Sequence, residues 1–159
     1  MEGEHFNELI MKDDLLNSLM VAFLGQIDSA LKVSEIISSH GNEEELSPDS
    51  LITGLIYRLM IPMEDHEISK SLNQGDKIME DIKSLLQGDE EESSDEETSL
   101  DEVIDEGLRT VTRNNCNCNV CCKARACLIN YPTYEAQDDL AQKFKDAIDR
   151  SCKIHNITI

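Results

Sequence analysis

The chain has 159 residues, enough for one domain of ordinary size or two small ones joined by a linker. With three Phe, three Tyr and no Trp, it is too poor in aromatic residues to stack a series of bases of single-stranded nucleic acid. A formal net charge of −19 repels phosphate backbones and anionic lipids, so the expected partners are basic surfaces, metal cations or other proteins.

The apolar residues from Phe6 to Ile37 recur at helical spacing, which predicts one amphipathic helix, or two helices broken near Gly25. Five residues of this stripe lie seven positions apart: Leu9, Leu16, Phe23, Ala30 and Ile37. We interpret the stripe as a core-facing side rather than a dimer seam, because a seam needs clearer heptads with charged flanks. The polar run from Ser38 to Gly41 is expected to end the element.

A second helix is predicted to begin at Ser47-Pro48-Asp49. Ser can cap the free amides, Pro fits the first turn, and Asp suits the positive end of the helix dipole. Pro62 ends this helix, and the spaced apolar residues from Ile68 to Leu86 predict one or two further short helices. Residues 1–87 are therefore expected to form a small antiparallel helical bundle.

Residues 88–100 are expected to form a disordered acidic linker, because the run GDEEESSDEE has no apolar residue and repels itself. Ser93 and Ser94 precede acidic residues, a context that acidophilic kinases favour, although such runs are commonly plain solvated spacers. The following residues, Ser99 to Glu102, resemble a capping box, which predicts a short helix reaching Val111.

Residues 101–159 are expected to form a helical Cys/His module. Tyr131-Pro132-Thr133 is a predicted break, with Thr133 as a candidate N-cap of the last helix. One face of that helix carries an apolar stripe that ends in a thiol and an imidazole: Leu140, Phe144, Ile148, Cys152 and His155.

The cysteines carry the most specific chemical signal. Cys118 and Cys121 form a C-x2-C turn, and Cys152 and His155 form a C-x2-H pair on a predicted helix. Each spacing points two ligands the same way, and three thiolates with one imidazole suit the tetrahedral preference of zinc. The predicted zinc ligands are Cys118, Cys121, Cys152 and His155, with Cys116, Cys122 and Cys127 as substitutes.

Two other interpretations of the cysteines stay open. Free Cys packs like a small hydrophobe, so a helix across residues 117–130 would align Val120, Ala124, Cys127 and Leu128 as an ordinary buried stripe. Cys118 and Cys121 also have redox spacing, with the basic residues Lys123 and Arg125 near enough to lower a thiol pKa.

Zinc catalysis is less favoured than a structural role, because thiols could fill every position and no Glu lies within the cysteine cluster. We therefore predict no catalytic residue. The isolated histidines His5, His40 and His66 lie in polar contexts and are expected at the surface.

The start of the chain, Met1 to Leu9, is acidic and lacks the features of a secretory signal, and no apolar stretch is long enough to cross a bilayer. Six cysteines without an export signal indicate an intracellular, reducing compartment, the cytoplasm or the nucleus. In that setting, crowded cysteines favour metal binding over disulfides.

Two stretches carry a resemblance: residues 50–72, SLITGLIYRLMIPMEDHEISKSL, and residues 118–135, CNVCCKARACLINYPTYE. They resemble small uncharacterised proteins of nucleocytoplasmic large DNA viruses. The resemblance implies an intracellular setting in an infected host cell, and it transfers neither an activity nor a site residue.

The leading hypothesis is a non-enzymatic interaction or scaffold protein, in which zinc folds a C-terminal Cys/His module too small to bury its own core. One alternative is a nucleic-acid-binding module in the mildly basic tail, residues 113–153, using Arg113, Lys123, Arg125, Lys143 and Lys145. The other alternative is a thiol-disulfide redox protein.

Overall fold

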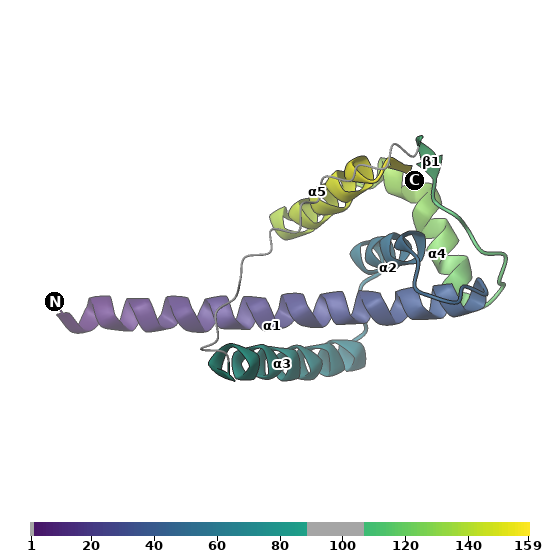
Figure 1. The fold of residues 1–159 in the computed structure, drawn as a ribbon. Helices are drawn as coiled ribbons and strands as arrows, with labels where there is room; N and C mark the ends of the chain where they lie inside the picture. The colour runs from purple at the N-terminus through teal and green to yellow at the C-terminus, as the bar shows by residue number, and fades with distance from the viewer. Residues whose placement is uncertain (1, 89–106) are drawn as a thin grey trace. The chain divides into compact units, whose positions relative to one another are not determined.

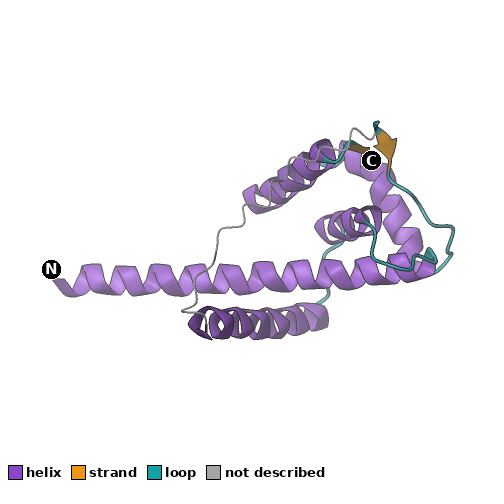
Figure 2. Ribbon diagram, in the orientation of Figure 1, coloured by secondary structure: helices purple, strands orange, loops and turns teal. Residues whose placement is uncertain are grey.

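The computed structural model describes residues 2–88 and 107–159, with side chains from residue 11 onward in the first range. These residues form five α-helices, one 3-10 turn and two short strands (Figures 1 and 2). The helices confirm the all-α prediction, including a helical Cys/His region near the C-terminus. The predicted linker beyond Gly88, with Ser93 and Ser94, lies outside the described residues.

The first helix, α1 (Glu2–His40), is continuous and is not broken at Gly25. It ends at His40, within the predicted polar run. The N–H of Gly41 still donates four residues back, to the carbonyl oxygen of Ile37 at 2.9 Å, whereas the N–H of Asn42 donates only three residues back, to that of Ser39 at 3.2 Å. Asn42 follows with φ of 54°, a left-handed conformation that Asn tolerates better than most residues. The chain therefore reverses directly after His40.

Helix α2 (Pro48–Met60) begins and ends at the predicted signals. The hydroxyl of Ser47 accepts a hydrogen bond from the N–H of Ser50 at 3.1 Å, and the last helical residue precedes Pro62 by two positions. Helix α3 (Asp65–Gly88) is one element rather than two short ones.

The described residues fall into two compact units, residues 2–29 with 63–88 and residues 30–62 with 107–159. This grouping differs from the division predicted above, which placed residues 30–62 in the N-terminal bundle. In the first unit, α1 and α3 approach each other at glycines. A Cβ atom on Gly25 would lie against the carbonyl oxygen of Ser71, and one on Gly75 against that of Val21.

The second unit contains the hydrophobic core. Helix α2 packs against α4 (Asn119–Asn130) and α5 (Asp139–Ile154), and a Cβ atom on its Gly54 would lie only 2.6 Å from the carbonyl oxygen of Ala30. The buried side chains that pack together in the larger cluster are Ile52, Ile56, Val111, Cys127, Leu128, Tyr131, Ile148, Cys152 and Ile157.

The tail differs from the prediction in two places. Residues 107–111 are extended and not helical, because strand β1 (Arg109–Thr110) pairs in parallel with β2 (Ile157–Thr158). Helix α5 is capped by Asp138, whose carboxylate accepts from the N–H of Ala141 at 2.7 Å. Thr133 instead belongs to the 3-10 turn η1 (Tyr131–Thr133).

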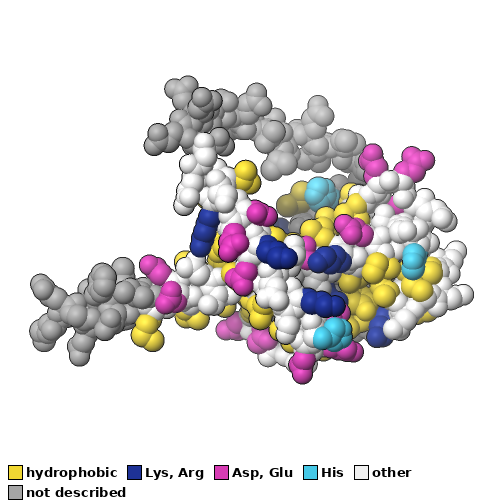
Figure 3. Space-filling view, turned by 90° about the horizontal axis from the view of Figure 1, so that it is seen from below, with side chains coloured by type: hydrophobic (Ala, Val, Ile, Leu, Met, Phe, Trp, Pro, Cys, Tyr) yellow, Lys and Arg dark blue, Asp and Glu magenta, His cyan; other side chains and the backbone are white. Residues whose placement is uncertain are grey.

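Among the described residues, none of the helices combines the length and the apolar character needed to cross a membrane. Hydrophobic side chains are nevertheless visible at the surface among charged ones on the face that Figure 3 shows.

Candidate metal centre

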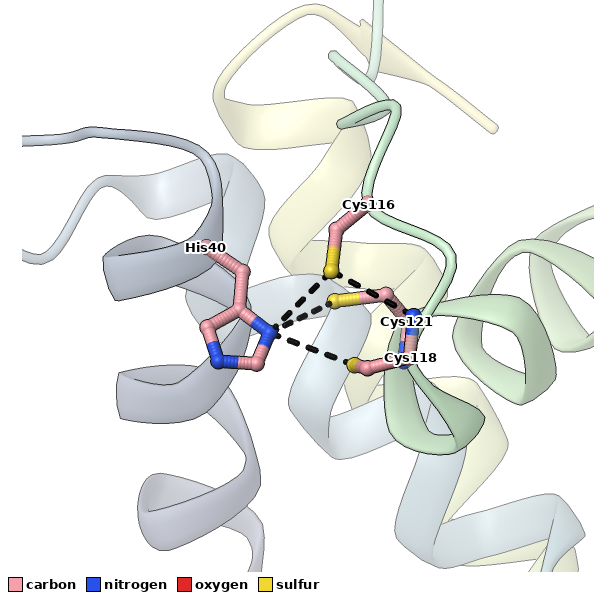
Figure 4. A group of neighbouring side chains, drawn as sticks. All are labelled: His40, Cys116, Cys118 and Cys121. Carbon is pink, nitrogen blue, oxygen red and sulfur yellow. Dashed lines mark hydrogen bonds between the residues drawn. The ribbon is translucent and has the colours of Figure 1, made fainter.

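One group of side chains in the described part of the chain has the composition and spacing of a metal site: His40, Cys116, Cys118 and Cys121. The potential ligand atoms all lie within 4.8 Å of one another (Figure 4). The Nδ1 atom of His40 is 3.3 Å from the sulfur of Cys116, 3.2 Å from that of Cys118 and 3.6 Å from that of Cys121. The group could therefore hold a metal ion.

The start of α4 positions two of the sulfurs. Cys118 is the N-cap of this helix, and its Sγ accepts a hydrogen bond from the N–H of Cys121 at 3.4 Å. The N–H of Cys118 donates in turn to the Sγ of Cys116 at 3.4 Å. These bonds and the positive end of the helix dipole both favour thiolate sulfur.

His40 is the last residue of α1, and Asn114 links that helix end to the cysteines. The side-chain amide of Asn114 donates to the carbonyl oxygen of Ile37 at 3.0 Å and to the Sγ of Cys121 at 3.3 Å. The imidazole is thereby held beside the cysteine turn (Figure 4).

Arg125 holds the segment that presents Cys116. Its Nη1 donates to the carbonyl oxygen of Cys116 at 2.6 Å and to that of Asn114 at 2.9 Å. Its Nη2 donates to the sulfur of the exposed Cys122 at 3.4 Å. The guanidinium thus fixes the loop that carries Cys116 and adds positive charge beside the sulfur of Cys122.

The two cysteines of the C-x2-C turn differ in acidity. The hydrogen bond from the N–H of Cys121, with further contacts from the side chains of Cys121, Cys116 and His40, lowers the pKa of Cys118 to about 6. Burial raises the pKa of Cys121 to about 11, and the neighbouring sulfurs of Cys118 and Cys116 add to that rise. Without a metal, Cys118 is therefore the thiolate of the pair near neutral pH.

An open pocket of about 430 Å³ adjoins the group. His40, Glu43, Arg113 and Cys116 are among the residues that line it. His40 is exposed, and Cys116 and Cys118 are half-buried. Solvent and small chelators can therefore reach the ligand atoms from this side.

The structure brings together two of the four predicted ligands, Cys118 and Cys121, with the first substitute, Cys116. It does not bring Cys152 or His155 to them. Cys152 is buried in the hydrophobic core, where burial raises its pKa, and His155 is exposed just after the end of α5.

The remaining substitutes also lie outside the group. Cys127 is buried in the same core as Cys152, and burial raises its pKa. Cys122 is exposed on the first turn of α4. The buried-thiol interpretation thus describes Cys127 and Cys152, while the metal interpretation fits the cysteines before and at the start of α4.

His40 was expected to be an isolated surface histidine, and that expectation missed its neighbours. The residue is exposed, but its ring lies beside three sulfurs. The sequence contains no local ligand spacing around His40, since its cysteine neighbours follow 76 to 81 positions later.

The chain matches no known protein family, no curated protein and no solved structure. The resemblance to proteins of large DNA viruses therefore stays a prediction.

Proposed function

We propose that His40, Cys116, Cys118 and Cys121 bind a structural zinc ion, and that the protein is a non-enzymatic interaction or scaffold protein. The observation that carries the proposal is the convergence of one imidazole nitrogen and three sulfurs within 4.8 Å.

The distances between the ligand atoms support a tetrahedral site. With Zn–S near 2.3 Å and Zn–N near 2.0 Å, the nitrogen and each sulfur of a tetrahedral centre lie about 3.5 Å apart. The three separations in this protein run from 3.2 to 3.6 Å. Thiolate and imidazole ligands in this geometry select zinc over the hard cations that prefer oxygen.

The composition of the group favours a structural role. A catalytic zinc ion keeps one position open for water and usually has a carboxylate nearby to move protons. Here four protein atoms are available to fill a tetrahedral shell, and none of them is a carboxylate oxygen. The carboxylate of Glu43, which lines the adjoining pocket, accepts a hydrogen bond from the hydroxyl of Ser50. We therefore assign no reaction to it.

Zinc would join segments that are distant in the sequence but belong to the same compact unit. It would fasten the end of α1 to the segment that leads into α4, next to the smaller core cluster of Val33, Ile37, Tyr57 and Ala124. Because a site of this kind does not exist in the unfolded chain, the free energy of metal binding adds to the stability of the fold.

The charge supports an interaction role. The chain carries 33 acidic against 14 basic residues, so a protein with a basic surface is the favoured partner. We place this role inside the cell, in a reducing compartment where the thiols stay available to the metal.

The test is elemental analysis of protein purified under reducing conditions without added metal, with titration of free thiols before and after chelation. We expect about one zinc ion per chain, as four ligands complete one tetrahedral shell. Chelation should make three thiols newly reactive, while Cys127 and Cys152 stay protected as long as the core is folded. Metal-free protein with freely titrating thiols at Cys116, Cys118 and Cys121 would overturn the zinc site.

Thiol redox chemistry is the second candidate, and the C-x2-C turn favours it. Cys118 lies at the N-terminus of a helix with a pKa of about 6, and Cys121 is buried behind it. In such a reaction the two thiols would form a disulfide, and two electrons and two protons would pass to a disulfide of a partner protein. Two results together would favour this candidate. Cys118 of the wild-type protein should be alkylated fast, and the wild-type protein should reduce a substrate disulfide, an activity that Cys121→Ser should lose.

The nucleic-acid candidate has less support, because two of its five basic residues have internal contacts. Arg125 holds the loop before α4, and Lys145 forms an ion pair with Asp149 at 3.0 Å. Binding to nucleic acid that weakens steeply with salt would revive it.

A further inference from the structure

The first unit, made of residues 2–29 of α1 and α3, has almost no core of its own. Its buried residues among those with described side chains are Gly25, Ser71 and Gly75, and none of them is a large apolar residue. Helices in proteins draw most of their stability from packing of an apolar face, and among the described side chains of this pair the apolar ones are at most partly buried.

The apolar face that could supply it lies on α1. Six large side chains there are between 41% and 71% exposed: Met11, Leu15, Leu16, Leu19, Met20 and Phe23. At about 100° per residue they fall within one half of the helix circumference. Lys12 is the single charged residue of positions 11–23 in that half, and its stem can lie along apolar surface. We call these six residues the α1 face.

The same side of α1 is already used for packing further along the helix. Ala30, Val33 and Ile37 continue the stripe in the second unit, where they are buried. There the sequence interpretation of a core-facing side is correct. Between Met11 and Phe23 the stripe has the same apolar character, but among the described residues its large side chains are exposed.

The area is sufficient for a specific contact. The exposed fractions of the six side chains equal about three fully exposed ones, on the order of 600 Å² at roughly 200 Å² each. A patch of this size is at the upper limit for the surface of a monomer. Two such faces in contact would bury about 1,200 Å², where specific interfaces begin.

We propose that the α1 face is the contact between two copies of this chain, which pair through their α1 helices on the side away from α3. The occupant must itself present an apolar helical face, and the second copy supplies an identical one. A partner with a basic surface would gain from the acidic residues elsewhere in the chain and not from this side of α1, where the one charged residue of positions 11–23 is Lys12.

The test is sedimentation analysis of the full, reduced, zinc-supplemented chain over about a hundredfold range of concentration. The on-face variant combines Leu16→Glu with Leu19→Glu. The matched off-face variant combines Asn17→Glu with Ser18→Glu, so that both variants add two negative charges to the same turns of α1. We expect a dimer for wild type and for the off-face variant. The on-face variant should be monomeric, with at least a tenfold weaker association.

A wild-type chain that is monomeric throughout the range would overturn the proposal, and so would an on-face variant that stays dimeric. Helicity and zinc content are measured in the same samples, so that a monomer caused by unfolding is recognised. If the on-face variant unfolds, Phe23→Ala takes its place. It removes apolar area without adding charge, and it should raise the dissociation constant of the dimer. The proposal is independent of the zinc site, since a metal-free dimer contradicts only the zinc site and a zinc-bound monomer contradicts only the dimer.

Discussion

The Nδ1 atom of His40 lies 3.2 Å from the sulfur of Cys118, although 78 residues separate them along the chain. One residue ends α1 and the other caps α4. A metal ion between them would therefore stabilise tertiary structure directly, by joining two helix ends that have no backbone connection nearby.

Replacing His40 by Ala should remove one of the four ligands. We expect zinc binding to weaken by at least a hundredfold, and the stabilisation by added zinc to fall by about 2.3 to 2.7 kcal/mol when the free zinc concentration is 100 times the dissociation constant of the wild type. His66→Ala is the matched control, because His66 is exposed and pairs with the exposed Glu64, outside the metal group. Zinc-dependent melting temperatures of the two variants measure the difference. Equal responses to zinc would contradict the role of His40.

The ligand set predicted from the sequence can be separated from the set in the structure. We expect Cys116→Ser to lose zinc, and Cys152→Ser and His155→Ala to keep it. Cys152→Ser should instead lower the free energy of unfolding by about 1–3 kcal/mol, because a hydroxyl replaces a thiol in the apolar core. Elemental analysis and urea unfolding of the three variants give both readouts. Loss of zinc in His155→Ala would instead support the ligand set predicted from the sequence.

Arg125 is expected to tune the site without binding the metal. In Arg125→Met the carbonyl oxygens of Asn114 and Cys116, in the loop before α4, lose the hydrogen-bond donors that hold them. Zinc affinity should fall by about 10- to 100-fold while one ion still binds. Arg125→Lys should recover only part of the lost zinc affinity, because an ammonium group lacks the planar, forked arrangement of N–H donors that a guanidinium has. The matched control is Lys123→Met on the same helix, for which competition with a metal indicator should show wild-type affinity.

Asp49 should make stability depend on acid. Burial alone would raise the pKa of this carboxyl, but the N–H of Thr112 at 2.7 Å and the guanidinium of Arg109 outweigh burial and lower it. Because its pKa is lowered in the folded state, the carboxyl stabilises the protein at pH values above its ordinary pKa of 3.8. This contribution is lost as the pH falls through the folded-state pKa.

The corresponding variant is Asp49→Asn. It should be less stable than wild type by about 1–2 kcal/mol at neutral pH, and the gap should close below the ordinary pKa of the carboxyl. Urea unfolding of both proteins at matched pH values measures the gap. Release of zinc in acid affects both proteins alike, so the difference isolates Asp49. A gap that stays constant into strong acid would exclude the carboxylate as its source.

Much of the helical structure could be predicted from local sequence. Ser47 and Pro48 start α2, and the stripe from Phe6 to Ile37 gives α1, because capping and amphipathic spacing act over a few residues. The C-x2-C turn was likewise readable, since Cys118 and Cys121 are brought together by the first turn of a single helix.

Tertiary structure decided the rest. Cys152 and His155 could share a side only if α5 continued through both, but the helix ends at Ile154, and Asn156 turns the chain with φ of 52° into β2. Cys152 packs in the core with Ile148, while His155 remains exposed. His40 carries no local signal at all. Its place beside the sulfurs follows from the contacts that hold the end of α1 against α4, and such contacts between distant segments leave no spacing in the sequence.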